Sequence, residues 1–97
     1  MSQLGDDLEK YKDDALTKKD AWAAIKLIGE ICGAGAVMLV AANLIAALFG
    51  PGGVATVGTG TCYYLLKKCG DIYADLPSDQ RKLIRKLARG IHGLLGS

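Results

Sequence analysis

Residues 31–66 read ICGAGAVMLVAANLIAALFGPGGVATVGTGTCYYLL, a stretch without Asp, Glu, Lys, Arg or His. Every charged side chain of the 97-residue chain lies outside it. As a helix, its first half (31–49) would be about 28 Å long, close to the ~30 Å hydrocarbon core of a bilayer. Its second half (51–66) would be about 24 Å long. The helix-breaking sequence GPGG at 50–53 separates the halves, so the stretch predicts a hydrophobic helical hairpin.

Two environments could bury such a hairpin. Tyr63 and Tyr64 stand just before Lys67 and Lys68, an order of aromatic and then basic residues that is typical of a membrane interface. A soluble helical bundle with the hairpin as its buried centre is the other option, because a chain of this size can form one modest core. The stretch alone leaves both open.

The composition favours a small all-α protein. Hydrophobic residues make up 51% of the chain and aromatic residues only 6%, so a core must consist mainly of Ala, Leu, Ile, Val and Gly. Such residues suit close packing between helices. We therefore expect a single domain over residues 1–97, an all-α bundle of four or five helices around the central hydrophobic hairpin.

The spacing of apolar residues gives the expected helices. An unbroken helix over 18–49 would be about 48 Å long, whereas a compact domain of this length is roughly 30–35 Å across. Either the helix breaks, most naturally near 33–35, or the protein is not compact in water. Thr17 and Asp20 form a capping signature before that helix. The predicted elements are an amphipathic helix at 3–16, a helix at 18–49 with or without a break near 33–35, a helical segment at 51–76 and a basic amphipathic helix at 78–95.

The last predicted helix carries its charges on one face and its apolar residues on the other. The basic residues are Arg81, Lys82, Arg85, Lys86 and Arg89. A cationic amphipathic helix of this kind is typical of the surface of an anionic membrane. A terminal helix that covers a bundle and turns its basic face to water has the same pattern. We predict that these five residues form a face for a membrane or a partner.

Small residues in the uncharged stretch are predicted to let helices approach closely. The residues concerned are Gly33, Gly35, Ala42, Asn43 and Ala46. Asn43 could bond to a neighbouring helix or meet water at the edge of the bundle. The glycines do not form a dinucleotide-binding or phosphate-binding loop, because the third glycine of the first motif and the lysine of the second are missing.

Residues for catalysis or metal binding are nearly absent. The single histidine, His92, has no nucleophile and acid in a recognisable arrangement, and its spacing from Cys62 and Cys69 matches no standard zinc site. We predict a non-enzyme without catalytic residues, cofactor or metal. A net charge of +2 without a basic stripe interleaved with aromatics also argues against nucleic acid.

The three cysteines and the acidic N-terminal region without a signal peptide predict reduced thiols. The expected location is cytoplasmic or associated with an inner membrane, without secretion through a cleavable signal peptide.

Two apolar segments, an uncharged turn and a charged C-terminal region resemble the layout of phage holins. A hydrophobic hairpin among amphipathic helices is also similar to pore-forming colicin domains and Bcl-2 proteins. The resemblance covers roughly residues 18–95, concerns layout alone and implies no functional residues. It implies a membrane-active, non-enzymatic protein whose hairpin inserts in or associates with a bilayer.

The alternative function is a soluble helical interaction module, such as an adaptor, inhibitor or immunity protein. The expected partners are accordingly an anionic membrane or a protein, with homo-oligomers as a further possibility.

Overall fold

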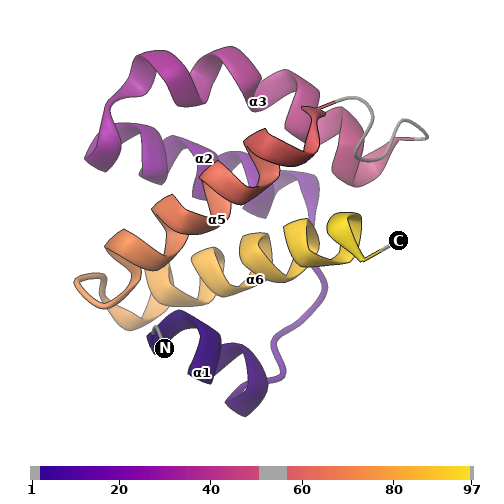
Figure 1. Cartoon of the computed structure of the whole chain (residues 1–97). Coiled ribbons are helices and arrows are strands. Elements are labelled where there is room, and N and C mark those ends of the chain that lie inside the picture. The colour runs from indigo at the N-terminus through magenta and orange to yellow at the C-terminus, as the bar shows by residue number, and fades with distance from the viewer. Residues whose placement is uncertain (1–2, 51–56, 97) are drawn as a thin grey trace.

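The computed structural model describes residues 3–50 and 57–96, and the side chains of these residues other than 34–40. This part of the chain contains five α-helices and no strand. The helices are α1 (Gln3–Lys10), α2 (Lys18–Cys32), α3 (Ala34–Phe49), α5 (Thr59–Tyr73) and α6 (Ser78–Leu95). They form a compact bundle with principal extents of 30 × 28 × 25 Å (Figure 1). In the described residues, the predicted all-α class is confirmed.

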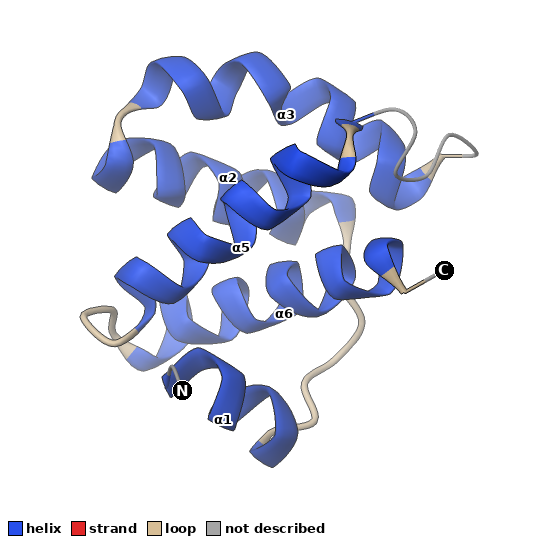
Figure 2. Ribbon diagram, in the orientation of Figure 1, coloured by secondary structure: helices blue, strands red, loops and turns tan. Residues whose placement is uncertain are grey.

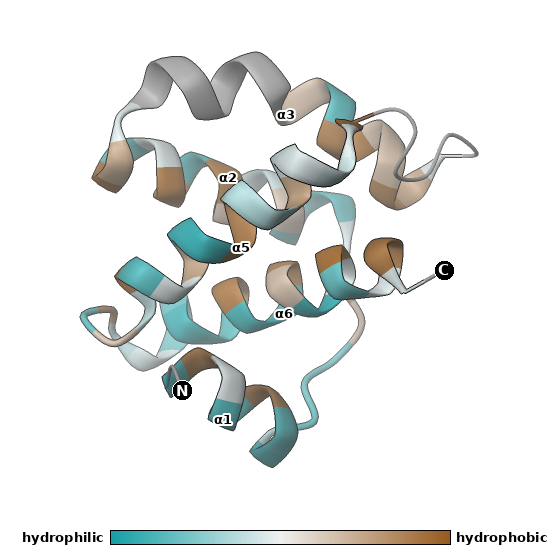
Figure 3. Ribbon diagram, in the orientation of Figure 1, coloured by the Kyte–Doolittle hydropathy of each residue, from teal (hydrophilic) through white to brown (hydrophobic). Residues whose placement is uncertain are grey.

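The last helix, α6, lies at the centre of the bundle and contacts each of the other four described helices. Its apolar side chains Ile84, Leu87, Ala88 and Ile91 are completely buried. In Figure 2, α2 and α3 lie on one side of α6, and α1 lies on the other. Apolar and polar residues alternate along α6 at helical spacing (Figure 3). The core is therefore organised around an amphipathic helix.

The structure does not show residues 31–66 as a hydrophobic hairpin at the centre of the bundle. α3 packs mainly on α2, with a smaller contact on α6, and forms the outer layer at the top of Figure 1. α5 packs on α6, α1 and α2. The centre is occupied by α6 instead. The physical reason is that other helices can surround an amphipathic helix once its charged residues pair with groups inside the protein. α3 instead buries one side and leaves Ala42, Asn43 and Ala46 exposed.

A break separates α2 from α3 at Gly33, within the segment where the length argument placed one. Gly33 has φ +104°, a backbone conformation that side-chain-bearing residues rarely adopt. Its N–H donates to the carbonyl oxygen of Gly29 at 3.0 Å and so closes α2. The two helices are about 22 and 24 Å long, and α3 folds back along α2 within the bundle (Figure 1).

The first helix ends at Lys10, earlier than the expected end at residue 16. The carbonyl oxygens of Leu8 and Tyr11 instead accept hydrogen bonds from Nη2 of Arg89, at 2.8 and 2.7 Å. In a continued helix these oxygens would accept from amides four residues later. A side chain of α6 thus takes the place of helical hydrogen bonds, and residues 11–17 follow without helix.

The remaining helix boundaries follow local signals. The predicted cap is confirmed, because Oγ1 of Thr17 accepts from the Asp20 N–H at 3.1 Å where α2 begins. α5 begins at Thr59 after Gly58, which has φ +90°. It therefore covers only part of the expected 51–76, of which 51–56 lie outside the described residues. The last helix occupies the expected residues 78–95.

Replacing Gly33 with Ala should lower the free energy of unfolding by about 1–3 kcal/mol, because a Cβ is strained at this backbone conformation. Urea denaturation followed by circular dichroism measures the change. Gly70→Ala is the matched control: Gly70 lies inside α5 with open space where a Cβ would stand, so alanine should be neutral or stabilise by up to about 1 kcal/mol. Equal effects of the two substitutions would contradict a conformational requirement at Gly33.

Candidate interaction surfaces

The five basic residues of α6 do not form one outward face. Lys82 is exposed and Arg81 is half-buried. Arg85 is only 8% exposed, and the side chains of Lys86 and Arg89 are 10% and 39% exposed. The structure therefore separates Arg81 and Lys82 from three cations that are turned toward the rest of the protein.

Arg85 lies at the centre of a polar cluster that joins α6 to α5 and to the N-terminal region. Its Nε and Nη2 donate to the two carboxylate oxygens of Asp13 at 2.8 and 3.0 Å. Its Nη1 donates to the Tyr73 hydroxyl at 3.0 Å, and that hydroxyl donates to Asp7 at 2.5 Å. The Tyr11 ring lies over the guanidinium, with its centroid 4.4 Å from Cζ. Directly or through the Tyr73 hydroxyl, one guanidinium therefore links α6 to α5 and to three residues of the N-terminal region.

The electrostatics of this cluster favour charged Asp13 and Arg85. The hydrogen bonds from Arg85 lower the pKa of Asp13, with the charges of Arg85 and Arg89 adding to this effect. The same hydrogen bonds raise the pKa of Arg85. Burial raises the pKa of Tyr73, and its hydrogen bond to Asp7 acts in the same direction. At neutral pH the cluster thus contains a bidentate ion pair beside a neutral phenol.

The other two cations also have partners within the protein. Nζ of Lys86 lies 2.9 Å from a carboxylate oxygen of Asp20. Arg89 binds the carbonyl oxygens of Leu8 and Tyr11, and its Nη1 lies 3.6 Å from Asp13. Most of these acceptors belong to residues 3–17, which we call the N-terminal strap. The strap therefore covers much of the basic face that was predicted to meet a membrane or a partner.

The predicted helix-packing residues do not form the intramolecular contact of α3. Ala42, Asn43 and Ala46 are exposed. Among the described side chains of α3, the buried ones are Ala41, Leu44, Ile45 and Ala47. In the described part of α3, these three residues therefore lie outside the packed side of the helix. Gly33 breaks the helix and has open space where a Cβ would stand. The surroundings of Gly35 lie outside the part of the structure that is described.

The close approach that the sequence reasoning missed is at Gly90. A Cβ built there would lie 3.1 Å from Cδ2 of both Leu16 and Leu48. Gly90 thus allows α6 to approach both α3 and the N-terminal strap. The signal was present in the sequence, because Gly90 follows Leu83 and Leu87 at helical spacing on the apolar face of α6.

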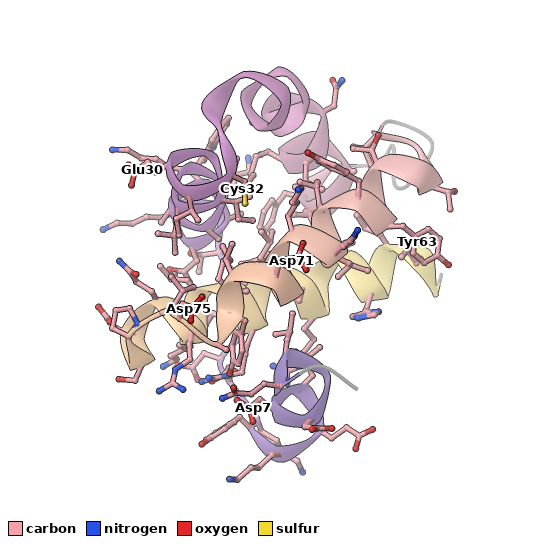
Figure 4. All side chains as sticks on the ribbon, turned by 60° about the vertical axis from the view of Figure 1, so that its left-hand side comes forward. Asp7, Glu30, Cys32, Tyr63, Asp71 and Asp75 are labelled. Carbon is pink, nitrogen blue, oxygen red and sulfur yellow. The ribbon has the colours of Figure 1, made fainter. Side chains whose placement is uncertain are left out.

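An exposed patch on α5 contains the aromatic and basic residues that the sequence placed at an interface. Tyr63 is 60% and Tyr64 is 44% exposed. Lys67 is exposed, and Nζ of Lys68 lies 5.4 Å from the centroid of the Tyr64 ring. Neither lysine forms an ion pair with a described residue. We call these four residues the α5 patch; Figure 4 shows Tyr63 directed outward from the helix.

The side chains that could support redox or metal chemistry are dispersed or buried. Cys32, Cys62 and Cys69 are free thiols, and only Cys32 is exposed. Burial raises the pKa of Cys69 to about 12, so this residue is a protonated, apolar component of the core at neutral pH. Among the described residues, no group of three His, Cys, Asp or Glu side chains could hold a metal ion.

Within the described residues, the helices are too short or too polar to cross a bilayer. Comparison with protein-family models, curated proteins and solved structures finds no match.

The Asp13–Arg85 pair should make stability fall in acid. The folded state lowers the pKa of Asp13 below its ordinary 3.8, so the pair's contribution is present above that pH. It is lost as the pH falls through the lowered pKa. Urea denaturation from pH 7 down to about pH 2.5 should show a steeper acid loss for the wild-type protein than for Asp13→Asn.

Asp14→Asn is the matched control for this series, because Asp14 is the exposed neighbour of Asp13 and makes no ion pair with a described residue. It should follow the wild-type curve. Wild-type and Asp13→Asn proteins with parallel pH profiles would contradict the assigned role of the pair.

Proposed function

We propose that this protein is a non-enzymatic, membrane-associating helical protein that contacts an anionic bilayer through the α5 patch. The observation that carries the proposal is the exposure of Tyr63 and Tyr64 beside two lysines that have no ion-pair partner among the described residues. Tyrosine suits the membrane interface because its ring is apolar and its hydroxyl can stay hydrated. Lysine can extend its ammonium group toward headgroups from an apolar stem.

The expected strength of this contact is moderate. Each basic residue close to an anionic surface contributes about 1 kcal/mol, and the effect declines within a Debye length of ~8–10 Å. Two lysines and two partly inserted tyrosines would support reversible association. The uncharged α3 adds apolar surface without any charge to desolvate, and its described residues Ala42 and Ala46 are exposed.

The basic face of α6 supports the proposal less well than the α5 patch. Arg85, Lys86 and Arg89 already bind carboxylates or carbonyl oxygens of the protein. Contact with lipid phosphate would require these bonds to break first. Lys82, which is exposed, remains available for an anionic surface.

Insertion of residues 31–66 as a central hydrophobic hairpin is the stronger form of the same proposal. It would require α3 to separate from α2 and α5 to separate from α6. The absence of charge throughout that stretch supports this form, since no ionised side chain would have to enter the hydrocarbon.

Binding to a protein is the second candidate, favoured by Trp22 and Ile31. These α2 side chains are 43% and 50% exposed and lie outside the α5 patch. A shallow groove of about 200 Å³ between α2 and α6 is lined by residues that include Leu27 and Leu83. Aromatic residues are enriched at protein interfaces, whereas lysine is depleted there. Trp22 therefore suits a protein partner better than the α5 patch does.

Flotation with vesicles of neutral phosphatidylcholine, alone or mixed with about 30% anionic phosphatidylserine, tests the membrane proposal. The wild-type protein should float with the anionic vesicles and lose much of that binding in about 0.5 M salt. Removing both charges with Lys67→Gln and Lys68→Gln should reduce binding by roughly tenfold or more, from about 1 kcal/mol per lysine. Tyr63→Ser with Tyr64→Ser should weaken it at every salt concentration.

The matched control is Lys18→Gln with Lys19→Gln, which removes the same charge from two exposed lysines at the start of α2. It should float like the wild-type protein, and circular dichroism should show all variants equally helical. Failure of the wild-type protein to float with anionic vesicles would refute membrane association and leave the protein-binding candidate.

A further inference from the structure

We infer that the N-terminal strap occupies a binding groove on α6 whose external ligand is an acidic segment of a partner protein, in which a short amphipathic helix is followed by a non-helical stretch. The strap would then be an internal stand-in for that ligand. This inference concerns a different surface from the α5 patch and does not rest on membrane association.

The strap is attached mainly by polar contacts. Among its residues, Leu4 is the one buried hydrophobic side chain, and Leu8 and Leu16 are partly buried. α1 has eight residues, fewer than the ~12–15 that an isolated helix needs for appreciable stability in water. Segments with few buried apolar contacts open locally at a lower free energy than the whole domain unfolds. The strap is therefore the part of the described fold most suited to exchange.

The surface beneath the strap is complementary to an acidic ligand. Arg85 and Tyr73 are both buried, and their hydrogen-bond partners in the strap are Asp13 and Asp7. A strap that leaves would take the bidentate carboxylate partner from Arg85 and expose its guanidinium to water, where a carboxylate of another chain could accept the same two hydrogen bonds. Arg89 would also lose two carbonyl acceptors. The groove thus presents two guanidinium groups in need of oxygen acceptors.

The strap shows which kind of ligand fits. Its Leu4 and Leu8 are four residues apart, so they share one side of α1 and supply the apolar contact. Asp7 and Asp13 supply the carboxylates, and the latter pairs with Arg85 in a bidentate geometry. A fitting ligand is therefore an acidic segment whose first part is a short amphipathic helix and whose second part, like residues 11–17, is not helical.

A fluorescent peptide with the sequence of residues 3–17 provides the probe, and the receptor is the full chain carrying Asp7→Asn and Asp13→Asn. These substitutions weaken the chain's own strap and leave the groove residues unchanged. Fluorescence anisotropy should show binding at least about tenfold tighter than to the wild-type protein, whose own strap competes for the groove. The same peptide with both aspartates replaced by asparagine should bind at least about tenfold more weakly.

The matched receptor control carries Asp6→Asn and Asp14→Asn, which remove the same charge from strap positions outside the Arg85 cluster. It should bind the peptide as weakly as the wild-type protein. If the first receptor does not fold by circular dichroism, Leu4→Ala with Leu8→Ala opens the strap through its apolar contacts instead.

The inference is overturned if a folded, opened receptor fails to bind the acidic peptide or binds the asparagine peptide equally well. It is also overturned if opening the strap increases binding to anionic vesicles above that of the wild-type protein while the peptide stays unbound, since the groove would then accept lipid.

Discussion

The buried guanidinium of Arg85 sets the position of the N-terminal segment of this protein. An arginine that is only 8% exposed must have its donors satisfied, and here Asp13 and Tyr73 accept from it. Because Asp13 lies in the segment after α1, that segment must cross α6 at the height of Arg85. The early end of α1 follows from a neighbouring contact, since Arg89 takes the carbonyl oxygens of Leu8 and Tyr11.

The central position of α6 gives its basic residues a structural role inside the protein. An amphipathic helix with a cationic face resembles a surface element in sequence, yet α6 is surrounded by the other described helices. Its apolar face forms the core and part of its cationic face holds the N-terminal strap. Some cations, such as Lys67, have no ion-pair partner among the described residues. They are therefore better placed than Arg85 to bind an external anion.

Local features of the fold were predictable, whereas the partners of α6 were not. Thr17 and Asp20 are three residues apart, and Gly33 breaks a helix that would exceed the diameter of the domain, so both signals are contained in short segments. The Arg85–Asp13 contact joins residues 72 positions apart, and helical periodicity carries no information on such pairs. The side of α3 that packs on α2 was also not predictable, because a helix that is apolar all round does not indicate which side packs. For the candidate site, the order of residues in the sequence singled out Tyr63 and Tyr64, which are exposed, but did not indicate that Arg85 is internal.

A double-mutant cycle on Asp13→Asn and Arg85→Met, measured by urea denaturation at neutral pH, tests most directly whether this ion pair holds the strap to α6. Each single variant leaves an unpaired buried group, so each should be destabilised by about 3 kcal/mol. The double variant should be less destabilised than the sum of the two, with a coupling free energy above about 1 kcal/mol. Additivity within about 0.5 kcal/mol would show that the two residues act independently and would contradict the central role of the pair.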